Sequence, residues 1–458
     1  MRRAIIYILI CSLMLNACGT ATEQEESGNA GVNQATSSAV TASDSALTAS
    51  GAAAGAEKLE ESEVPKKTDS VKSKKKIVKI ITDETGKQRK LKTEPVNVEN
   101  KGIYFSSSRW ITNYSQVQDG HYYYMRGYNT IYRDKGEKVG KFWPDDDYFY
   151  DDCEPIGLVR YKKKFYVLLD WFHETDDGDW ENENVLAYVD LKKKKAVPLW
   201  NMSEGPLVEG EGFVFCNFYN DFLYYNSRSH WDESFGRPGN LVKSPLKSQK
   251  EQETITTTAN LAKAKPYLTY IDGKIYYGLQ EGKKVTLYSH DLESGQEEKV
   301  FCYKRKDKKK TKIFLDMDED YIYCQEYLIP RSGGKMIKAF ADAKIFKGKS
   351  YYEYSPRSLS YSYNKKYIFY IDKNYKVHRI DKNTQENRVV SNLKAAEVNC
   401  TEDRVYVKVH AGAWYDKKFW KVLFEDDEGY IDGGYYYDHL YCMDLDGKNV
   451  KRIWEGSR

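Results

Sequence analysis

Two acidic stretches hold side chains that are suited to metal chemistry. The first, ETDDGDWENE, carries five carboxylates: Asp176, Asp177, Asp179, Glu181 and Glu183. Carboxylate oxygens are the ligands that calcium prefers. An EF-hand loop needs ligands at alternate positions and a glycine at the sixth, and this spacing does not match it. We therefore expect a solvated acidic loop here and at EDDEGYID, which begins at Glu425. The sequence predicts no metal site.

Motifs for enzyme catalysis are missing from the sequence. It contains no GxSxG, no HExxH and no P-loop, and its seven histidines do not cluster. The region after residue 76 has an even number of cysteines, which permits disulfides in an exported protein. Most of these cysteines stand where other segments have an aromatic or aliphatic residue, so buried free thiols are the better expectation. They are Cys153, Cys216, Cys302, Cys324, Cys400 and Cys442. We predict no catalytic residue and no cofactor.

Large aromatic residues in long insertions are the candidate ligand contacts. Exposed tryptophan is costly unless it is covered or used, and it gives rigid contact area to sugar rings or protein partners. The alternative is that these side chains pack the insertions onto the scaffold. The candidates are Trp171, Trp180, Trp231, Trp414 and Tyr415. By contrast, Trp143, Trp200 and Trp454 recur at the end of a fourth strand, so we interpret them as scaffold.

Cys18 is a candidate for modification. Arg2 and Arg3 precede an apolar stretch, Ala4 to Leu15, that is too short to span a bilayer. It ends in Leu15-Asn16-Ala17-Cys18-Gly19, which resembles the bacterial lipobox. The resemblance implies that residues 1–17 are a signal peptide and that Cys18 is acylated with two lipid chains, which together hold a protein on a membrane. The alternative is an ordinary secretory signal with a chance cysteine. We expect an extracytoplasmic protein, lipid-anchored to the outer face of the cell membrane.

The segment 18–76 has the composition of a disordered tether. It is rich in Ala, Ser, Thr, Gly and Glu and nearly free of aromatic residues, so it cannot bury enough surface to fold.

The net charge of the whole chain is close to zero. The 71 Lys and Arg residues nearly balance the 68 Asp and Glu residues, which gives a net charge of +3. This balance does not indicate a nucleic-acid partner.

From Ile77 onward the sequence repeats a four-strand unit. A strand, a tight turn and a second strand with a Tyr-x-Tyr-like core recur, as in YLTYIDGKIYYGL, and a second hairpin follows each, as in TLYSHDLESGQEEKVF. About seven such units, with six to eight possible, predict an all-β fold, a β-propeller of four-stranded antiparallel blades over residues 77–458. An open solenoid or stacked sandwiches are the alternatives. Residues 77–101 hold an extra hairpin, which either closes the ring or begins an eighth blade.

The second strand of each unit, as in Lys274-Ile275-Tyr276-Tyr277-Gly278, resembles the YWTD strand of low-density-lipoprotein-receptor propellers. The chain is still more similar to propellers of unknown function in bacterial lipoproteins, chiefly of Gram-positive anaerobes. This resemblance covers roughly residues 102–458. No unit reads Tyr-Trp-Thr-Asp and the receptor family has six blades, so the receptor's ligand sites are not carried over.

Loop length predicts one functional face. The turns between strands one and two are tight, whereas long insertions, which begin at Asp170, Asn226, Glu326 and His410, fall between strands two and three. Such loops on a rigid scaffold usually carry binding. We expect a surface-anchored module that binds a protein, peptide or glycan through these loops. The alternative is a glycan hydrolase or lyase with two carboxylates over the central channel.

Overall fold

The computed structural model describes most of the chain from residue 76 onward. The segments outside the described residues are 1–75, 108–114, 127–128, 143–152, 175–179, 202–213, 228–239, 248–252, 256, 265–267, 307–312, 314, 347–357, 360, 412–436 and 456–458. The predicted signal peptide, Cys18 and nearly all of the tether therefore lie outside them. Lys72–Arg458 forms one compact unit.

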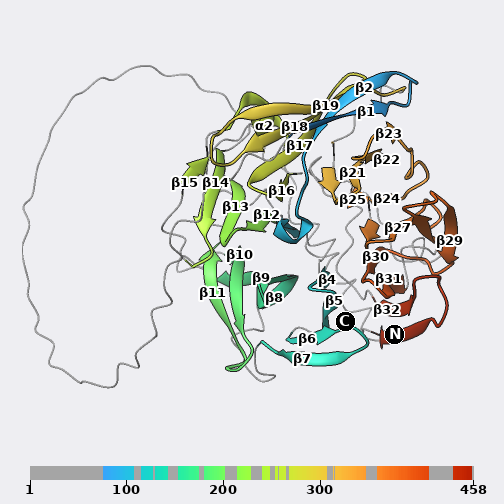
Figure 1. The fold of residues 1–458 in the computed structure, drawn as a ribbon. Helices are drawn as coiled ribbons and strands as arrows, with labels where there is room; N and C mark the ends of the chain where they lie inside the picture. The colour runs from blue at the N-terminus through green and yellow to red at the C-terminus, as the bar shows by residue number, and fades with distance from the viewer. Residues whose placement is uncertain are drawn as a thin grey trace, which may run out of the picture. The chain divides into compact units, whose positions relative to one another are not determined.

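Seven sheets of the described residues are the blades of a β-propeller, which confirms the predicted fold (Figure 1). Within each blade, neighbouring strands follow one another along the chain and pair antiparallel; in the fifth blade only the first three strands pair in this way. The first three blades contain β4 (Ser115–Gln118), β5 (His121–Arg126), β6 (Thr130–Arg133) and β7 (Glu137–Lys141); β8 (Cys153–Tyr161), β9 (Lys164–Glu174), β10 (Trp180–Asp190) and β11 (Lys195–Asn201); and β12 (Val214–Tyr219), β13 (Phe222–Ser227), β14 (Asn240–Pro245) and β15 (Glu253–Ile255).

The last four blades continue in chain order. They contain β16 (Thr269–Ile271), β17 (Lys274–Glu281), β18 (Lys284–Asp291) and β19 (Glu297–Lys304); β20 (Leu315–Met317), β21 (Tyr321–Cys324), β22 (Tyr327–Pro330) and β23 (Gly334–Lys335); β26 (Tyr361–Tyr363), β27 (Tyr367–Ile371), β28 (Val377–Asp381) and β29 (Asn387–Ser391); and β30 (Glu397–Cys400), β31 (Arg404–Ala411), β32 (Tyr437–Asp444) and β33 (Lys451–Glu455).

The turns between the first and second strands explain why these hairpins form. In the first four blades both turn residues have positive φ, as at Asp272 (49°) and Gly273 (78°), which is the type I′ geometry that matches strand twist. In the next three blades a side chain closes the turn instead. Asp318 and Asn364 each accept backbone N–H groups from two and three residues ahead, and Thr401 accepts one from Arg404.

The ring closes between its last and first blades. A cluster of buried apolar side chains fills each of the seven junctions between neighbouring blades, the one between the seventh and first included. At that junction Tyr122 of β5 stacks on Tyr406 of β31, with ring centroids 4.3 Å apart and planes 13° apart. Trp454 of β33 packs against the same cluster, as its predicted scaffold role requires. The open-array alternative is therefore wrong.

The N-terminal hairpin neither closes the ring nor begins an eighth blade, so that expectation was wrong. β1 (Ile77–Thr82) pairs with β2 (Gln88–Thr93) and, in parallel, with β23 at the outer edge of the fifth blade. Ile81 and Leu91 are fully buried in the cluster that fills the junction between the fourth and fifth blades. The N-terminal hairpin docks at this edge because the fourth strand of blade five, β23, is only two residues long and leaves the edge of the blade open.

After the hairpin the chain runs into the centre of the ring (Figure 1). The short helix η1 (Val98–Asn100) leads to Lys101, which forms a β-bridge with Ile271 on the inner strand of the fourth blade. β3 (Ile103–Ser107) then pairs along β12, so the third blade gains a fifth, innermost strand. The segment thus occupies part of the central channel that an open propeller would leave free.

The strand order of the fifth blade differs from the predicted one. Residues from Glu326 onward were expected to be an insertion between strands two and three. Instead β22 follows β21 directly, and after a turn at Arg331 the chain returns to pair Ile337 with Leu328. The second hairpin was missed because its turn carries two adjacent glycines and its returning strand is very short. β24 (Ile345–Phe346) and β25 (Ser358–Leu359), which flank the connection to blade six, pair with each other.

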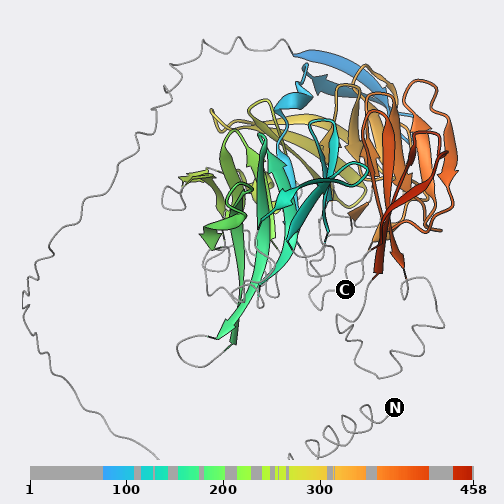
Figure 2. The ribbon, with the colours of Figure 1, turned by 90° about the horizontal axis from the view of Figure 1, so that it is seen from below.

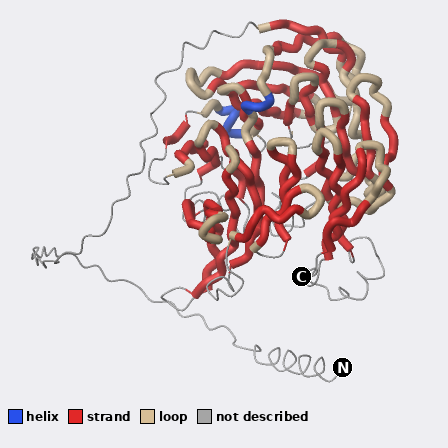
Figure 3. The backbone as a smooth tube through the Cα atoms, turned by 60° about the horizontal axis from the view of Figure 1, so that its bottom comes forward, coloured by secondary structure: helices blue, strands red, loops and turns tan. Residues whose placement is uncertain are grey.

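Helices contribute little to the described residues (Figure 3). Besides η1 they contain α2 (Ala259–Lys263), which Thr258 caps by accepting the backbone N–H of Leu261. In this part of the chain no helix has both the length and the apolar character needed to cross a membrane.

Candidate functional site

Strand direction separates two faces of the propeller, and we name the face at the ends of the second strands the 2–3 face. The described ends of two predicted insertions meet there, with Ser227 paired to Asn240 and Ala411 paired to Tyr437. The connections between first and second strands, at the opposite face, are short turns in all seven blades. The two connections therefore begin and end on the face that was predicted to carry the long loops, and the opposite face carries the short turns.

The insertion of the second blade is a hairpin rather than a loop. β9 and β10 are each 11 residues long, the longest strands among the described residues, and they carry the blade past its neighbours on the 2–3 face (Figure 2). Trp171 lies within β9 and pairs with Glu183, and Trp180 begins β10 and pairs with Glu174. The other candidates, Trp231, Trp414 and Tyr415, lie outside the described residues. Two carboxylates of the acidic stretch, Glu181 and Glu183, stand in β10, so the prediction that the whole stretch forms a loop was wrong.

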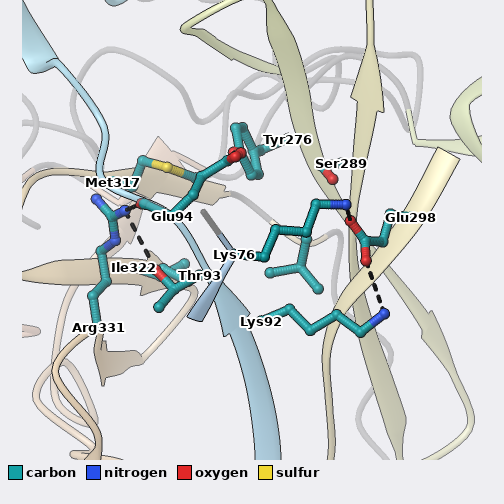
Figure 4. A pocket seen from close by; sticks show the side chains of 11 residues that line it. Lys76, Lys92, Thr93, Glu94, Tyr276, Ser289, Glu298, Met317, Ile322 and Arg331 are labelled. Carbon is teal, nitrogen blue, oxygen red and sulfur yellow. Dashed lines mark hydrogen bonds and ion pairs between the residues drawn. The ribbon is translucent and has the colours of Figure 1, made fainter. Parts of the chain in front are cut away.

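A pocket lies where the N-terminal hairpin meets the fourth and fifth blades (Figure 4). Its volume of about 30 Å³ holds roughly two water molecules and is far below the space that a small-molecule ligand needs. Lys76 and Lys92 donate to opposite oxygens of Glu298, at 2.6 and 2.8 Å. Burial opposes ionisation of Glu298, but the hydrogen bonds from the two lysines outweigh it and lower its pKa.

The other wall of the pocket is held by Arg331. Its guanidinium donates to the carbonyl oxygens of Asp318 and Glu94 and, at 3.4 Å, to the hydroxyl of Thr93. Burial lowers the pKa of Arg331. The polar groups of this pocket therefore fasten the hairpin to the ring, and its size leaves no room for a substrate.

In the channel, a charged residue of the N-terminal segment meets the inner strands of blades five and six. Lys101 donates to Asp316 of β20 and, at 2.7 Å, to the hydroxyl of Tyr363 on β26. Tyr361 and Tyr363 both donate to the second oxygen of Asp316, at 3.3 Å. Burial raises the pKa of both tyrosines. Both carboxylate oxygens of Asp316 therefore already accept hydrogen bonds. Glycosidase chemistry needs a pair of free carboxylates, and Asp316 does not fit that role.

Five of the cysteines predicted to be buried thiols are free. Cys216, Cys324, Cys400 and Cys442 are buried, and Cys302 is partly buried. Burial raises the pKa of the Cys324 and Cys400 thiols to about 12, which removes the thiolate that redox or metal chemistry requires.

One group of side chains that sequence analysis missed has the composition of a metal site. The ligand atoms of Asp342, Asp372 and His378 all lie within 4.8 Å of one another. The three residues belong to two different blades, and no local motif announces them. Asp372 directly follows a buried strand, which was the one available signal.

Comparison with known proteins gives no family. No protein-family model matches the chain, and no curated protein matches it. Among solved structures, BamB from Moraxella catarrhalis is 11% identical, with a TM-score of 0.33 over 65% of this chain and 82% of its own. Sqt1 from Saccharomyces cerevisiae is 8% identical, with a TM-score of 0.33 over 78% and 88%. TolB from Acinetobacter baumannii is 11% identical, with a TM-score of 0.27 over 78% and 63%. Likenesses this distant carry no argument about function, so the β-propeller assignment rests on the sheet topology.

Proposed function

We propose that this chain is a lipid-anchored surface protein whose β-propeller binds a protein, peptide or glycan through its 2–3 face. The observation that carries the proposal is the unequal length of the connections on the two faces. The opposite face has only short first turns, whereas the 2–3 face receives the 11-residue strands of blade two and the connections 228–239 and 412–436. Long connections on a rigid ring are where propellers and other scaffolds carry recognition.

Two further features support binding over catalysis. The pocket beneath the hairpin is too small for a substrate, and the channel carboxylate Asp316 is engaged by Lys101 and two tyrosines. Long connections gathered on one face suit a macromolecular or glycan ligand better than an enclosed site does. The likeness of the second strands to YWTD-type propellers of bacterial lipoproteins agrees with this proposal.

An array of glycans, cell-wall polymers and peptides, probed with residues 72–458, tests the proposal. We expect saturable binding to one class of arrayed compound, without release of product. The absence of binding to every class would contradict the binding function. Shortened glycan products in the incubated samples would instead favour the hydrolase or lyase.

The lipid anchor is tested by Cys18→Ala. Acylation needs the thiol, so the variant should leave the membrane fraction or remain with its signal peptide uncleaved. Membrane fractionation followed by mass spectrometry of the N-terminus measures both. Ser12→Ala in the same apolar stretch is the matched control and should fractionate as the wild type does. Mature, detergent-extracted Cys18→Ala protein would exclude acylation at this residue.

Substitution of tryptophan on the 2–3 face tests the binding surface. Changing Trp180, Trp231 or Trp414 to Ala should weaken binding of the array hit by about 2 kcal/mol or more at a hot spot, because a rigid aromatic contact is lost. Trp454→Ala is the control, since Trp454 packs in the junction between blades seven and one. It should lower thermal stability and leave affinity unchanged.

Parallel melting and titration separate the two roles of these tryptophans. If the three variants lose roughly 3 kcal/mol or more of stability while affinity is unchanged, the side chains pack the insertions and the 2–3 face is not the binding surface.

A further inference from the structure

The junction of blades five and six holds three potential metal ligands. After its short fourth strand, blade five crosses to blade six, where the Lys344 N–H donates to the Ile371 carbonyl and the Lys373 N–H donates to the Asp342 carbonyl. These backbone bonds set Asp342 beside Asp372, the first residue after β27. His378 of β28 completes the group, whose ligand atoms all lie within 4.8 Å of one another.

Neighbouring side chains fix the direction of every hydrogen bond around this group. The Tyr370 hydroxyl lies 2.9 Å from Asp342 Oδ1, and an ionised carboxylate only accepts, so Tyr370 must donate there. The Asn387 side chain lies 2.9 Å from the same hydroxyl, which can now only accept, so Asn387 presents its Nδ2. Asn387 Oδ1 then faces His378 Nδ1 at 3.0 Å, and this nitrogen must carry a proton.

The consequence concerns the other ring nitrogen. His378 Nε2 lies 3.2 Å from Asp372 Oδ2. Asp372 Oδ1 is already occupied, because it accepts the backbone N–H groups of Asn374 and Lys376, each at 2.8 Å. In a neutral imidazole protonated at Nδ1, the Nε2 lone pair therefore points at a carboxylate oxygen. Two acceptors facing each other need a cation, either a proton or a metal ion.

We propose that Asp342, Asp372 and His378 bind one divalent transition-metal ion of the zinc class. An imidazole nitrogen with two carboxylate oxygens suits zinc and its neighbours, whereas calcium takes six to eight oxygen ligands. Metal-bound histidine characteristically donates its other N–H to an amide or carboxylate oxygen, which is the role of Asn387 here. Ligands of one zinc ion lie about 3.3 Å apart, and the exposed Asp342 has the freedom to close the remaining gap.

The surroundings favour a bound ion over an open acidic patch. The side chains of His378 and Asp372 are 13% and 7% exposed, and the imidazole stacks on Tyr370 with centroids 4.9 Å apart. A metal ion would cross-link the irregular connection of blade five to the rigid sheet of blade six. This inference does not depend on the proposed ligand-binding function.

Zinc titration of the chelator-treated protein tests the site. We expect one zinc ion per chain by calorimetry, visible absorption bands when cobalt replaces zinc, and a melting temperature that rises with zinc concentration. Asp372→Asn and His378→Gln should abolish this binding, and Asn387→Leu should weaken it about 10- to 100-fold, the range for outer-shell partners. If Asp372→Asn or His378→Gln fails to fold, Asp342→Asn still tests zinc binding at this site, because Asp342 is exposed.

The matched control is His121→Gln. His121 Nδ1 lies 2.6 Å from Asp134 Oδ2, which gives a second histidine–aspartate pair, and the three-residue group does not include it. This variant should bind zinc as the wild type does. No stoichiometric zinc binding, or undiminished binding by both Asp342→Asn and His378→Gln, would overturn the proposal.

Discussion

Ending the chain after Asn399 should unfold the whole propeller rather than only its last blade. The truncation removes most of blade seven, including Tyr406, Leu440 and Cys442, and opens two junctions at once. Tyr122 and Tyr124 of the first blade then lose their partners, although they lie far away in the sequence. We expect no cooperative thermal transition, as followed by near-ultraviolet circular dichroism.

Removal of residues 1–71 is the matched control for this truncation. It takes away a segment outside the compact unit Lys72–Arg458, so the transition should keep its midpoint and its sharpness. A truncated propeller that melts sharply at the wild-type temperature would contradict ring closure, because only an open array of stacked repeats tolerates the loss of a terminal unit.

Asp318→Ala should be the most destabilising single substitution that we predict. The carboxylate accepts four hydrogen bonds, from the backbone of Asp320 and Tyr321 and, at 2.6 Å each, from the Tyr323 hydroxyl and Lys382 Nζ. Asp318 and Lys382 are 4% and 5% exposed, and they join blades five and six. Removal of one partner leaves a buried unpaired charge, so we expect a loss of about 3–5 kcal/mol of unfolding free energy in denaturant titration.

Two comparisons make this prediction specific. Asp318→Leu combined with Lys382→Met removes both charges and should recover much of the loss, since well-packed apolar residues often replace a buried pair at little cost. Asp221→Asn breaks the exposed pair with Lys162, whose side chains are 67% and 57% exposed, and keeps a residue type that tolerates the positive φ of 66° at this turn position. It should cost about 0–1 kcal/mol, and equal effects of Asp318→Ala and Asp221→Asn would show that the buried pair contributes no more than an exposed one.

The fold was predictable because its signals are local. Strand alternation, the Tyr-rich second strands and turn pairs such as Asp272-Gly273 each act over a few residues, and they recur often enough to reveal the blades. Prediction failed where a local signal was weak. In blade five, the turn after Arg331 resembles a flexible loop in sequence, so the residues from Glu326 onward were predicted to be an insertion rather than a hairpin.

The candidate face was only partly accessible to sequence analysis. Loop length indicated which connections are long and on which side they emerge, because antiparallel strands alternate direction. It did not show that Trp171 and Trp180 stand in paired strands, since charged and polar residues around Gly178 resemble an irregular loop. The ligand-contact role of all five candidates, Trp171, Trp180, Trp231, Trp414 and Tyr415, remains a prediction.

The sequence by itself determined the repeat and the strand order of six blades, because each is encoded in neighbouring residues; the lipobox-like leader is a prediction of the same local kind. Only the tertiary structure decided where the N-terminal hairpin docks, which carboxylates are buried and which are paired. Lys382 lies 64 residues from Asp318, and His378 meets Asp342 only because backbone bonds join two blades at that point. Such contacts depend on how blades pack around the ring, and no spacing along the chain encodes that packing.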